Sequence, residues 1–324
     1  MSQMFACRHW KTIALLLLCT LHAGATPAQE DARRTLRIIV PLTAGGPVDN
    51  CALLIAPQLE ARLKQPVIVE NRPGGGNAIG AQAVASAAAD GLTQFFQVAS
   101  TTTPVFIKDF ALDFMRDFDP VAPVWTVSYV MFINASVPAK NLKEFIDYAK
   151  ANPGKLNYAA GTASTMLAME MLKSRVGINL VPIPYKGSAP ALTALVANEV
   201  QAAFDVAGLH KQHVDGGKER ALYAADRQRS QVFPAVPTAA ELGYPDLEVV
   251  LTGGFWTRTG APRATVGRIN AAVNEILALP EMVERFKSAG WFVLRGTPDD
   301  LKQRTKGEMD FWVKAARTAN FQPE

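Results

Sequence analysis

Cysteine and histidine are scarce in this sequence of 324 residues. Cys51 is the only cysteine after residue 25, so that part of the chain can form no internal disulfide. The only histidines after residue 25 are His210 and His213, whose spacing places both on one helix face near Asp205 and Asp215. These histidines and aspartates would form only a weak candidate for a metal site, without a cysteine ligand. We therefore expect two solvated surface histidines, no metal and no cofactor.

An excess of charge of one sign is also lacking. The formal net charge is +4, and residues 1–25 contain Arg8, Lys11 and no acidic residue, so the charge without them is +2. A balance this close to neutral gives no argument for a nucleic-acid partner. Any selectivity for anions must therefore come from a local site.

Long apolar runs are absent except for one near the start, Ile13–Leu21. Basic residues precede it, and Ala23-Gly24-Ala25 follows it as an A-x-A cleavage site. This is the layout of a secretory signal peptide, and the run is about half the roughly 20 residues that span a membrane. We expect residues 1–25 to be a signal peptide that directs the protein to the periplasm.

Apolar patterning in the rest of the chain alternates between short β-branched runs and helical spacing. A length of 324 residues suggests about two domains. The alternation predicts parallel sheets and an α/β fold. The expected strands are 36–40, 66–70, 93–99, 156–160, 180–184 and 200–205, and the expected helices are 50–64, 77–89, 142–152, 165–176, 189–198, 262–278 and one that begins after Thr297.

Glycine-rich and hydroxyl-rich loops follow several of these strands. The segment Thr43–Asp49 leads from a strand into a helix and contains two glycines, which let a ligand approach the backbone closely. The first N–H groups of a helix have no internal partners and favour an anion. The loops Gly161–Ser164 and Ser100–Thr102 offer similar chemistry. Two such loops from different lobes could hold the two ends of a small dicarboxylate.

Motifs of the common enzyme classes are missing. Gly74, Gly76 and Gly80 are spaced one residue too far apart for a dinucleotide fingerprint, and there is no Walker A sequence and no G-x-S-x-G elbow. Cys51 and a histidine could in principle form a nucleophile and base. The position of Cys51 on the apolar side of a helix instead predicts a small buried residue. We expect no enzymatic activity.

Several motifs occur in the order typical of one family. Arg37-Ile38-Ile39-Val40-Pro41, followed by Ala44-Gly45-Gly46-Pro47, is similar to the opening of the Bug receptors. These are the periplasmic solute-binding subunits of tripartite tricarboxylate transporters. Val69-Glu70-Asn71-Arg72-Pro73-Gly74-Gly75-Gly76-Asn77 resembles the second signature of the family. Further similar segments are 117–122, 149–158, 184–192 and 236–241.

The resemblance implies a two-lobed, periplasmic binding protein-like (type II) α/β fold with a ligand cleft between the lobes. Lobe 1 would comprise 36–134 plus 251–324, and lobe 2 would comprise 135–250. Members bind small carboxylates through backbone N–H groups and waters, close like a hinge, and serve membrane transporter subunits; we expect a monomer. The contact positions carried over are Thr43, Ala44, Gly45, Gly46, Val48, Asp49, Ser100, Thr101, Thr102, Gly161, Thr162, Ser164, Lys186, Gly187 and Asp205.

The sequence departs from the family pattern where a ligand would lie. Val48 stands where threonine is common, Val206 where asparagine often follows the aspartate, and Thr252 where tryptophan is frequent. The loop 159–164 is about two residues shorter than usual, and Met166 replaces a polar residue. These changes suggest an unusual, less polar acid or weak binding. They also motivate an alternative, in which the protein is a periplasmic sensing partner that binds a sensor kinase ectodomain.

Overall fold

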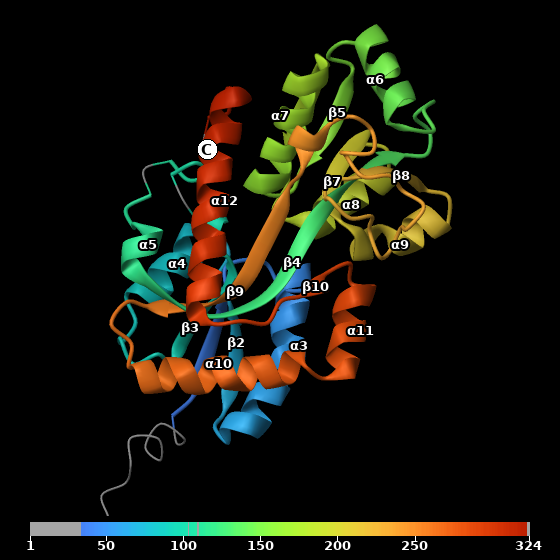
Figure 1. The fold of residues 1–324 in the computed structure, drawn as a ribbon. Helices are drawn as coiled ribbons and strands as arrows, with labels where there is room; N and C mark the ends of the chain where they lie inside the picture. The colour runs from blue at the N-terminus through green and yellow to red at the C-terminus, as the bar shows by residue number, and fades with distance from the viewer. Residues whose placement is uncertain (1–33, 103, 109, 323–324) are drawn as a thin grey trace, which may run out of the picture.

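The computed structural model describes residues 34–102, 104–108 and 110–322. The predicted signal peptide lies outside these residues. The described chain forms two lobes, each built on a β-sheet with helices packed against it (Figure 1). Within the described ranges no helix is both long enough and apolar enough to cross a membrane.

Lobe 1 contains the beginning and the end of the described chain. Its sheet has the order β2-β1-β3-β9-β4, and α10 and α12 pack against β4 (Figure 1). Apart from β4 and β9, which also connect the two lobes, the strands of lobe 1 are β1 (Leu36–Val40), β2 (Val67–Asn71), β3 (Thr93–Val98) and β10 (Phe292–Val293). The helices are α3 (Pro47–Leu63), α4 (Ala78–Ala85), α5 (Phe114–Asp117), α10 (Arg263–Leu277), α11 (Pro280–Ser288) and α12 (Pro298–Thr318), with short 3-10 turns η1 (Gly75–Asn77) and η2 (Ala99–Thr101).

Lobe 2 contains the middle of the chain. Its parallel strands have the order β7-β5-β6, and β8 pairs with the end of β4. The strands are β5 (Leu156–Ala160), β6 (Leu180–Pro184), β7 (Ala202–Val206) and β8 (Glu219–Ala224). The helices are α6 (Leu142–Ala151), α7 (Ala163–Val176), α8 (Ser188–Val196) and α9 (Ala207–Asp215), and a 3-10 turn η3 (Pro245–Leu247) precedes the return to lobe 1.

Two long strands join the lobes. β4 (Phe118–Asn134) leads into lobe 2, and β9 (Val250–Arg258) leads back. Along β4 the partner changes abruptly, because Ser128 pairs with Val250 of β9 whereas Tyr129 pairs with Val206 of β7. The two strands run side by side between the lobes in Figure 1. The lobe limits derived from the family resemblance remain a prediction; the pairing itself changes at Ser128 and Tyr129.

The expectation of parallel sheets is correct for only part of the fold. β1, β2 and β3 pair in parallel, as do β5, β6 and β7, whereas β4, β8, β9 and β10 form antiparallel pairs. The largest errors in the expected helix boundaries concern α3 and α4. α3 begins at Pro47 instead of residue 50, since proline suits the first helical position, and α4 ends at Ala85.

The core of lobe 1 fixes where the strands end. β3 is buried along its whole length, and Phe96 packs edge-on against Trp125 of β4 with ring centroids 4.8 Å apart. Trp125 in turn stacks on Trp291 at 4.9 Å, which ties the segment after α11 to the lobe connection. Cys51 lies in the same core, so its predicted burial is confirmed. Aromatic packing of this kind holds the loops at the strand ends in place.

Candidate functional site

The loop between β1 and α3 is held by the buried carboxylate of Asp49. Its Oδ2 accepts a hydrogen bond from the N–H of Gly45 at 2.8 Å, and its Oδ1 accepts one from Nδ2 of Asn71 at 2.8 Å. The same Asn71 nitrogen donates to the carbonyl of Leu42 at 3.2 Å. Gly45 has φ +82°, a conformation that favours glycine. Asp49 therefore shapes the loop rather than pointing into solvent.

The N-terminus of α3 is open. Thr43, Ala44 and Gly45 are exposed, and Gly46 is the N-cap residue. Among the described residues no side chain caps this end of the helix. Pro47, the first helical residue, has no N–H, so the groups available to an anion are the N–H groups of Val48 and Asp49. Val48 is buried and its side chain has no polar atom, so only its backbone can donate a hydrogen bond to a ligand.

The loops of lobe 2 meet this end of α3. Gly187 is the N-cap residue of α8, with φ +110° and no capping side chain among the described residues. A Cβ added to Gly187 would lie 3.5 Å from Oγ1 of Thr43, and one added to Gly161 would lie 3.2 Å from the carbonyl oxygen of Gly187. The structure thus brings Thr43, Gly161 and Gly187 together, and Lys186 stands exposed beside them.

The start of α7 is different, because its own side chains cap it. Thr162 and Thr165 form a capping box, in which Oγ1 of Thr162 accepts from the Thr165 N–H at 3.2 Å. Ser164 is buried, and its Oγ lies 3.1 Å from Oγ1 of Thr162 and 2.7 Å from the hydroxyl of Tyr129. The predicted hydroxyls of Thr162 and Ser164 are therefore engaged within the protein.

Tyr129 lies at the point where β4 passes from one lobe to the other. Burial raises the pKa of its hydroxyl, and the negative charges of Asp205 in lobe 2 and Glu308 in lobe 1 raise the pKa further. The hydroxyl consequently stays protonated and can donate a hydrogen bond. Its position between carboxylates of both lobes makes Tyr129 a central residue that the sequence patterns did not indicate.

The loop after β3 is connected to the C-terminal helix. Oγ of Ser100 donates to Oε2 of Glu308 on α12 at 2.9 Å. The neighbouring Thr101 donates to the carbonyl of Val98 at 2.7 Å, and Thr102 is buried. Burial raises the pKa of Glu308 to about 7, although hydrogen bonds from Thr252 and Ser100 and the charge of Arg304 oppose the rise. No sequence motif points to Glu308.

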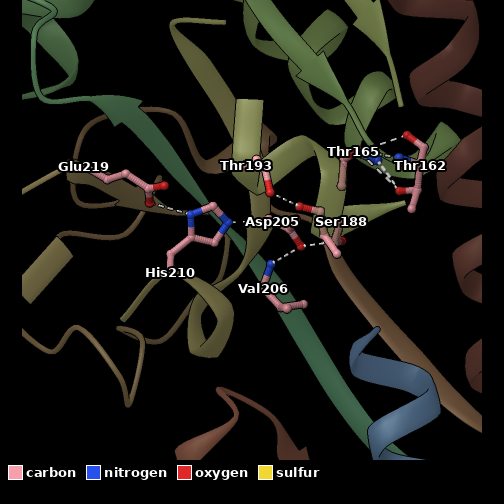
Figure 2. A network of polar contacts seen from close by, with 9 residues as sticks. Thr162, Thr165, Ser188, Thr193, Asp205, Val206, His210 and Glu219 are labelled. Atoms are coloured by element: carbon pink, nitrogen blue, oxygen red, sulfur yellow. Dashed lines mark hydrogen bonds and ion pairs between the residues drawn. The ribbon is translucent and has the colours of Figure 1, made fainter. Parts of the chain in front are cut away.

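A buried chain of polar groups stands behind the lobe 2 loops (Figure 2). Oδ1 of Asp205 accepts from Oγ of Ser188 at 2.9 Å and from the N–H of Val206 at 2.7 Å. Its Oδ2 lies 3.9 Å from Nε2 of His210, and Nδ1 of His210 lies 2.6 Å from Oε2 of Glu219. Asp205 therefore fixes the start of α8, where Gly187 is the N-cap.

The expectation that His210 is a solvated surface residue was wrong. Its side chain is fully buried and stacks on Phe132, with ring centroids 3.9 Å apart. Burial lowers the pKa of His210, but the carboxylates of Asp205 and Glu219 raise it by more, to about 9. The ring is thus a buried imidazolium between two carboxylates. In the described ranges no three His, Cys, Asp or Glu side chains are grouped as metal ligands.

The site consists of uncapped helix ends from both lobes around Thr43 and Gly187. The carboxyl of Glu308 accepts a hydrogen bond from Ser100, one of the predicted contact residues. Two α/β lobes joined by strands, with such helix ends facing each other, are the architecture of a solute-binding protein.

The family follows from comparison with known proteins. The chain belongs to the tripartite tricarboxylate transporter family receptors (TctC), whose family model matches residues 52–316. It is 33% identical to the protein BugT of Bordetella pertussis over 319 residues, which cover 95% of this chain and 97% of BugT. Receptors of this family are periplasmic binding proteins. The resemblance to Bug receptors is thereby confirmed.

Solved structures of similar proteins share the fold. The R. palustris protein Rpa4515 with adipate has a TM-score of 0.85 and 28% sequence identity, and the match covers 90% of this chain and 99% of that one. MatC from Rhodopseudomonas palustris with bound malate has a TM-score of 0.81 and 30% identity, covering 87% and 98%. The predicted two-lobed binding-protein fold is therefore confirmed.

Proposed function

We propose that this protein is exported to the periplasm, captures a small dicarboxylate between its lobes and delivers it to the membrane subunits of a tripartite tricarboxylate-type transporter. The observation that carries the proposal is the approach of Thr43 in lobe 1 to Gly187 in lobe 2, since a Cβ on Gly187 would lie 3.5 Å from Oγ1 of Thr43. Both residues flank helix ends that no described side chain caps.

The chemistry of these helix ends suits a carboxylate. Each favourable charge at a helix N-terminus contributes about 0.3–1 kcal/mol, and a hydrogen bond to a charged group contributes about 1.5–3 kcal/mol. One carboxylate of the ligand would accept from the N–H groups at the start of α3, and the other from those at the start of α8. Lys186, exposed beside Gly187, adds a positive charge on the lobe 2 side.

The similar proteins support the choice of ligand class. Rpa4515 was solved with adipate and MatC with malate, which are both dicarboxylates. Closure would bring the two helix ends onto the ligand. The lobes are joined by two neighbouring strands, β4 and β9, and a hinge needs only a few such residues to absorb the change in backbone angles.

Release of the ligand unchanged agrees with the chemistry of the only cysteine described. Burial raises the pKa of the Cys51 thiol well above its ordinary value. A buried thiol of this kind is inert as a nucleophile. We therefore propose a receptor without catalytic activity.

Isothermal titration calorimetry against mono-, di- and tricarboxylates tests the proposal. Dicarboxylates of four to six carbons should bind, and no heat from any carboxylate would overturn the proposal. Gly187→Ala should weaken binding about tenfold or more, because its Cβ narrows the approach to Thr43 and its φ of +110° strains any other residue.

Gly177→Ala is the matched control for that variant. Gly177 also has positive φ, +69°, but it caps the C-terminal end of α7 and has open space around it. Both variants carry backbone strain, and only Gly187→Ala alters the proposed site. Equal affinities in the two variants would contradict a role for the Gly187 loop.

Export and delivery need a separate experiment. Mass spectrometry of a periplasmic extract should find a chain that begins near residue 26, as the predicted cleavage after Ala25 requires. Cross-linking in intact cells before extraction should recover transporter membrane subunits. Recovery of a sensor kinase ectodomain without those subunits would favour the sensing alternative.

A further inference from the structure

Glu308 is an acidic side chain that the proposed anion site does not need. It lies on α12, the C-terminal helix, which packs against η2 and β9 in lobe 1 and against α7 in lobe 2 (Figure 1). The side chain is partly buried and receives a hydrogen bond from Ser100, in the loop after β3, at 2.9 Å. Ser100 is one of the contact positions that the family resemblance implies, so an ionised acid beside it would repel the ligand class proposed above.

The surroundings of Glu308 stabilise its charge only weakly. Its partners are neutral donors, the hydroxyl of Ser100 and the hydroxyl and N–H of Thr252. Arg304, one turn earlier on α12, is exposed and has only a small effect. Facing it from β4 is Tyr129, whose hydroxyl bonds to Ser164 at the start of α7. Among the described residues no salt bridge to Glu308 is formed.

We propose that Glu308 is a specificity-determining residue, which takes up one proton from solvent when a dicarboxylate binds and then donates a hydrogen bond to the nearer ligand carboxylate. The inference rests on the proposed function and deepens it, because it makes the site select for the number of negative charges on the ligand. The proton bound to Glu308 removes the repulsion that an ionised side chain would exert on the ligand.

The pKa of Glu308 makes proton uptake on ligand binding feasible near neutral pH. Burial raises its pKa to about 7, so the free protein holds a mixture of the two forms. A second negative charge within about 4–6 Å favours the protonated form further. Binding and protonation are then linked, and the affinity for a dicarboxylate must fall as the pH rises above 7.

Calorimetry with adipate between pH 6.5 and 8.5 measures this linkage. Repeating each titration in buffers of different ionisation enthalpy counts the protons taken up. For the wild-type protein we expect close to one proton at pH 8 and roughly twentyfold weaker binding at pH 8.5 than at pH 6.5. Monomethyl adipate, which lacks the second carboxylate, should bind with little dependence on pH. A flat profile with adipate would overturn the proposal.

The variant Glu308→Gln distinguishes a role of Glu308 in proton uptake from a purely structural role. The amide keeps the shape and an oxygen that can accept from Ser100, but it cannot take up a proton. We expect adipate to bind this variant with no proton uptake and no more than about twofold change across the same pH range. Asp310→Asn, an exposed carboxylate on the same helix, should keep the wild-type profile. Retention of the pH dependence in Glu308→Gln would contradict the inference.

The outcomes distinguish this inference from the proposed function. If neither adipate nor any other carboxylate binds at any pH, the receptor proposal itself is overturned. Binding that does not change with pH leaves the receptor intact and removes the role of Glu308. Because the proton count on the wild-type protein is sufficient for this decision, the test holds even if the variant does not fold.

Discussion

Gly208 in lobe 2 lies against the backbone of Ala289 in lobe 1, with no space between them for a side chain. A Cβ on Gly208 would lie 2.5 Å from the carbonyl oxygen of Ala289. Gly290 adds to the same contact, since its own Cβ would lie 3.2 Å from the Gly208 nitrogen. Gly208 is in the first turn of α9, shortly after Asp205 and Val206, so the lobes touch at the start of this helix.

Gly208→Ala should therefore push the two lobes apart. Overpacking of this kind costs about 1–3 kcal/mol, and here it acts on the contact between the lobes. We expect a lower free energy of unfolding in urea and weaker carboxylate binding by calorimetry. Gly267→Ala is the control, because Gly267 lies in α10 with nothing within 4 Å of an added Cβ, and the change should stabilise the helix by about 0.5–1 kcal/mol. If Gly208→Ala unfolded in urea and bound carboxylates like the wild-type protein, the contact between Gly208 and Ala289 would have to adjust without cost.

His210 should make stability depend on alkaline pH. Its pKa is about 9 in the folded protein, above its ordinary value of 6.5, so folding binds the proton more tightly. This contribution to stability is complete below pH 6.5 and is lost as the pH rises through about 9. Urea unfolding between pH 6 and 10 should show this loss.

Two histidine variants isolate the effect. His210→Gln should destabilise the fold by about 3–5 kcal/mol at pH 7, since it leaves Glu219 buried without its charged partner. The loss of stability between pH 6.5 and 9.5 should then be smaller than in wild type. His213→Gln, a partly exposed histidine three residues later, should change little. Identical pH profiles for wild type and His210→Gln would rule out the buried imidazolium.

Asp49→Ala should loosen the loop before α3. The change removes the acceptors of the Gly45 N–H and of the Asn71 amide, which should cost about 1–3 kcal/mol. Carboxylate affinity should fall about tenfold, because the helix end is no longer held in position. Asn50→Ala is the comparison, since the side chain of the exposed Asn50 donates to the Gly45 carbonyl at 3.4 Å, a long hydrogen bond. Calorimetry and urea unfolding measure both effects; equal results for the two variants would disprove a positioning role for Asp49.

Glu70 should contribute to stability in acid. The hydrogen bond from Arg37 is the largest cause that lowers the pKa of Glu70 to about 2; burial opposes it and Arg72 adds to it. The contribution is present above pH 4.5 and is lost as the pH falls through about 2. Since both side chains are partly exposed, we expect less than about 1 kcal/mol. Acid unfolding of Glu70→Gln, followed by circular dichroism, should show a correspondingly weaker dependence on pH than wild type, and an unchanged dependence would refute the prediction.

Local patterns in the sequence predicted the loops and most of the surrounding elements. β1, β5 and β6 have the expected bounds, and the glycines before α3 and α8 lie where the chain turns from strand to helix. Sequence patterns did not predict β4, because its 17 residues exceed the usual strand length of about 3–10 residues and because it contains Pro120 and Pro123. The structure accommodates both prolines at shifts in the pairing with β9.

The residues that sequence patterns missed depend on distant partners. Ser100 and Glu308 are 208 residues apart, and Tyr129 and Ser164 are 35 apart. Glu308 lies in a helix rich in charged residues, where a glutamate is typical of a solvated face. Only the folding of α12 against both lobes turns it into a partly buried acid. His210 was misjudged for the same reason, because its burial depends on Phe132 of β4 and Glu219 of β8.

The pairing of Ser128 with Val250 gives the fold a modular construction. The chain leaves lobe 1 and returns to it at opposite positions of one antiparallel ladder, so a two-residue hairpin turn is enough to close the gap. The segment between these two residues is therefore a unit that could be exchanged as a whole. Swapping it between relatives at this junction would recombine one half of a binding surface with another while the remaining strands keep their neighbours.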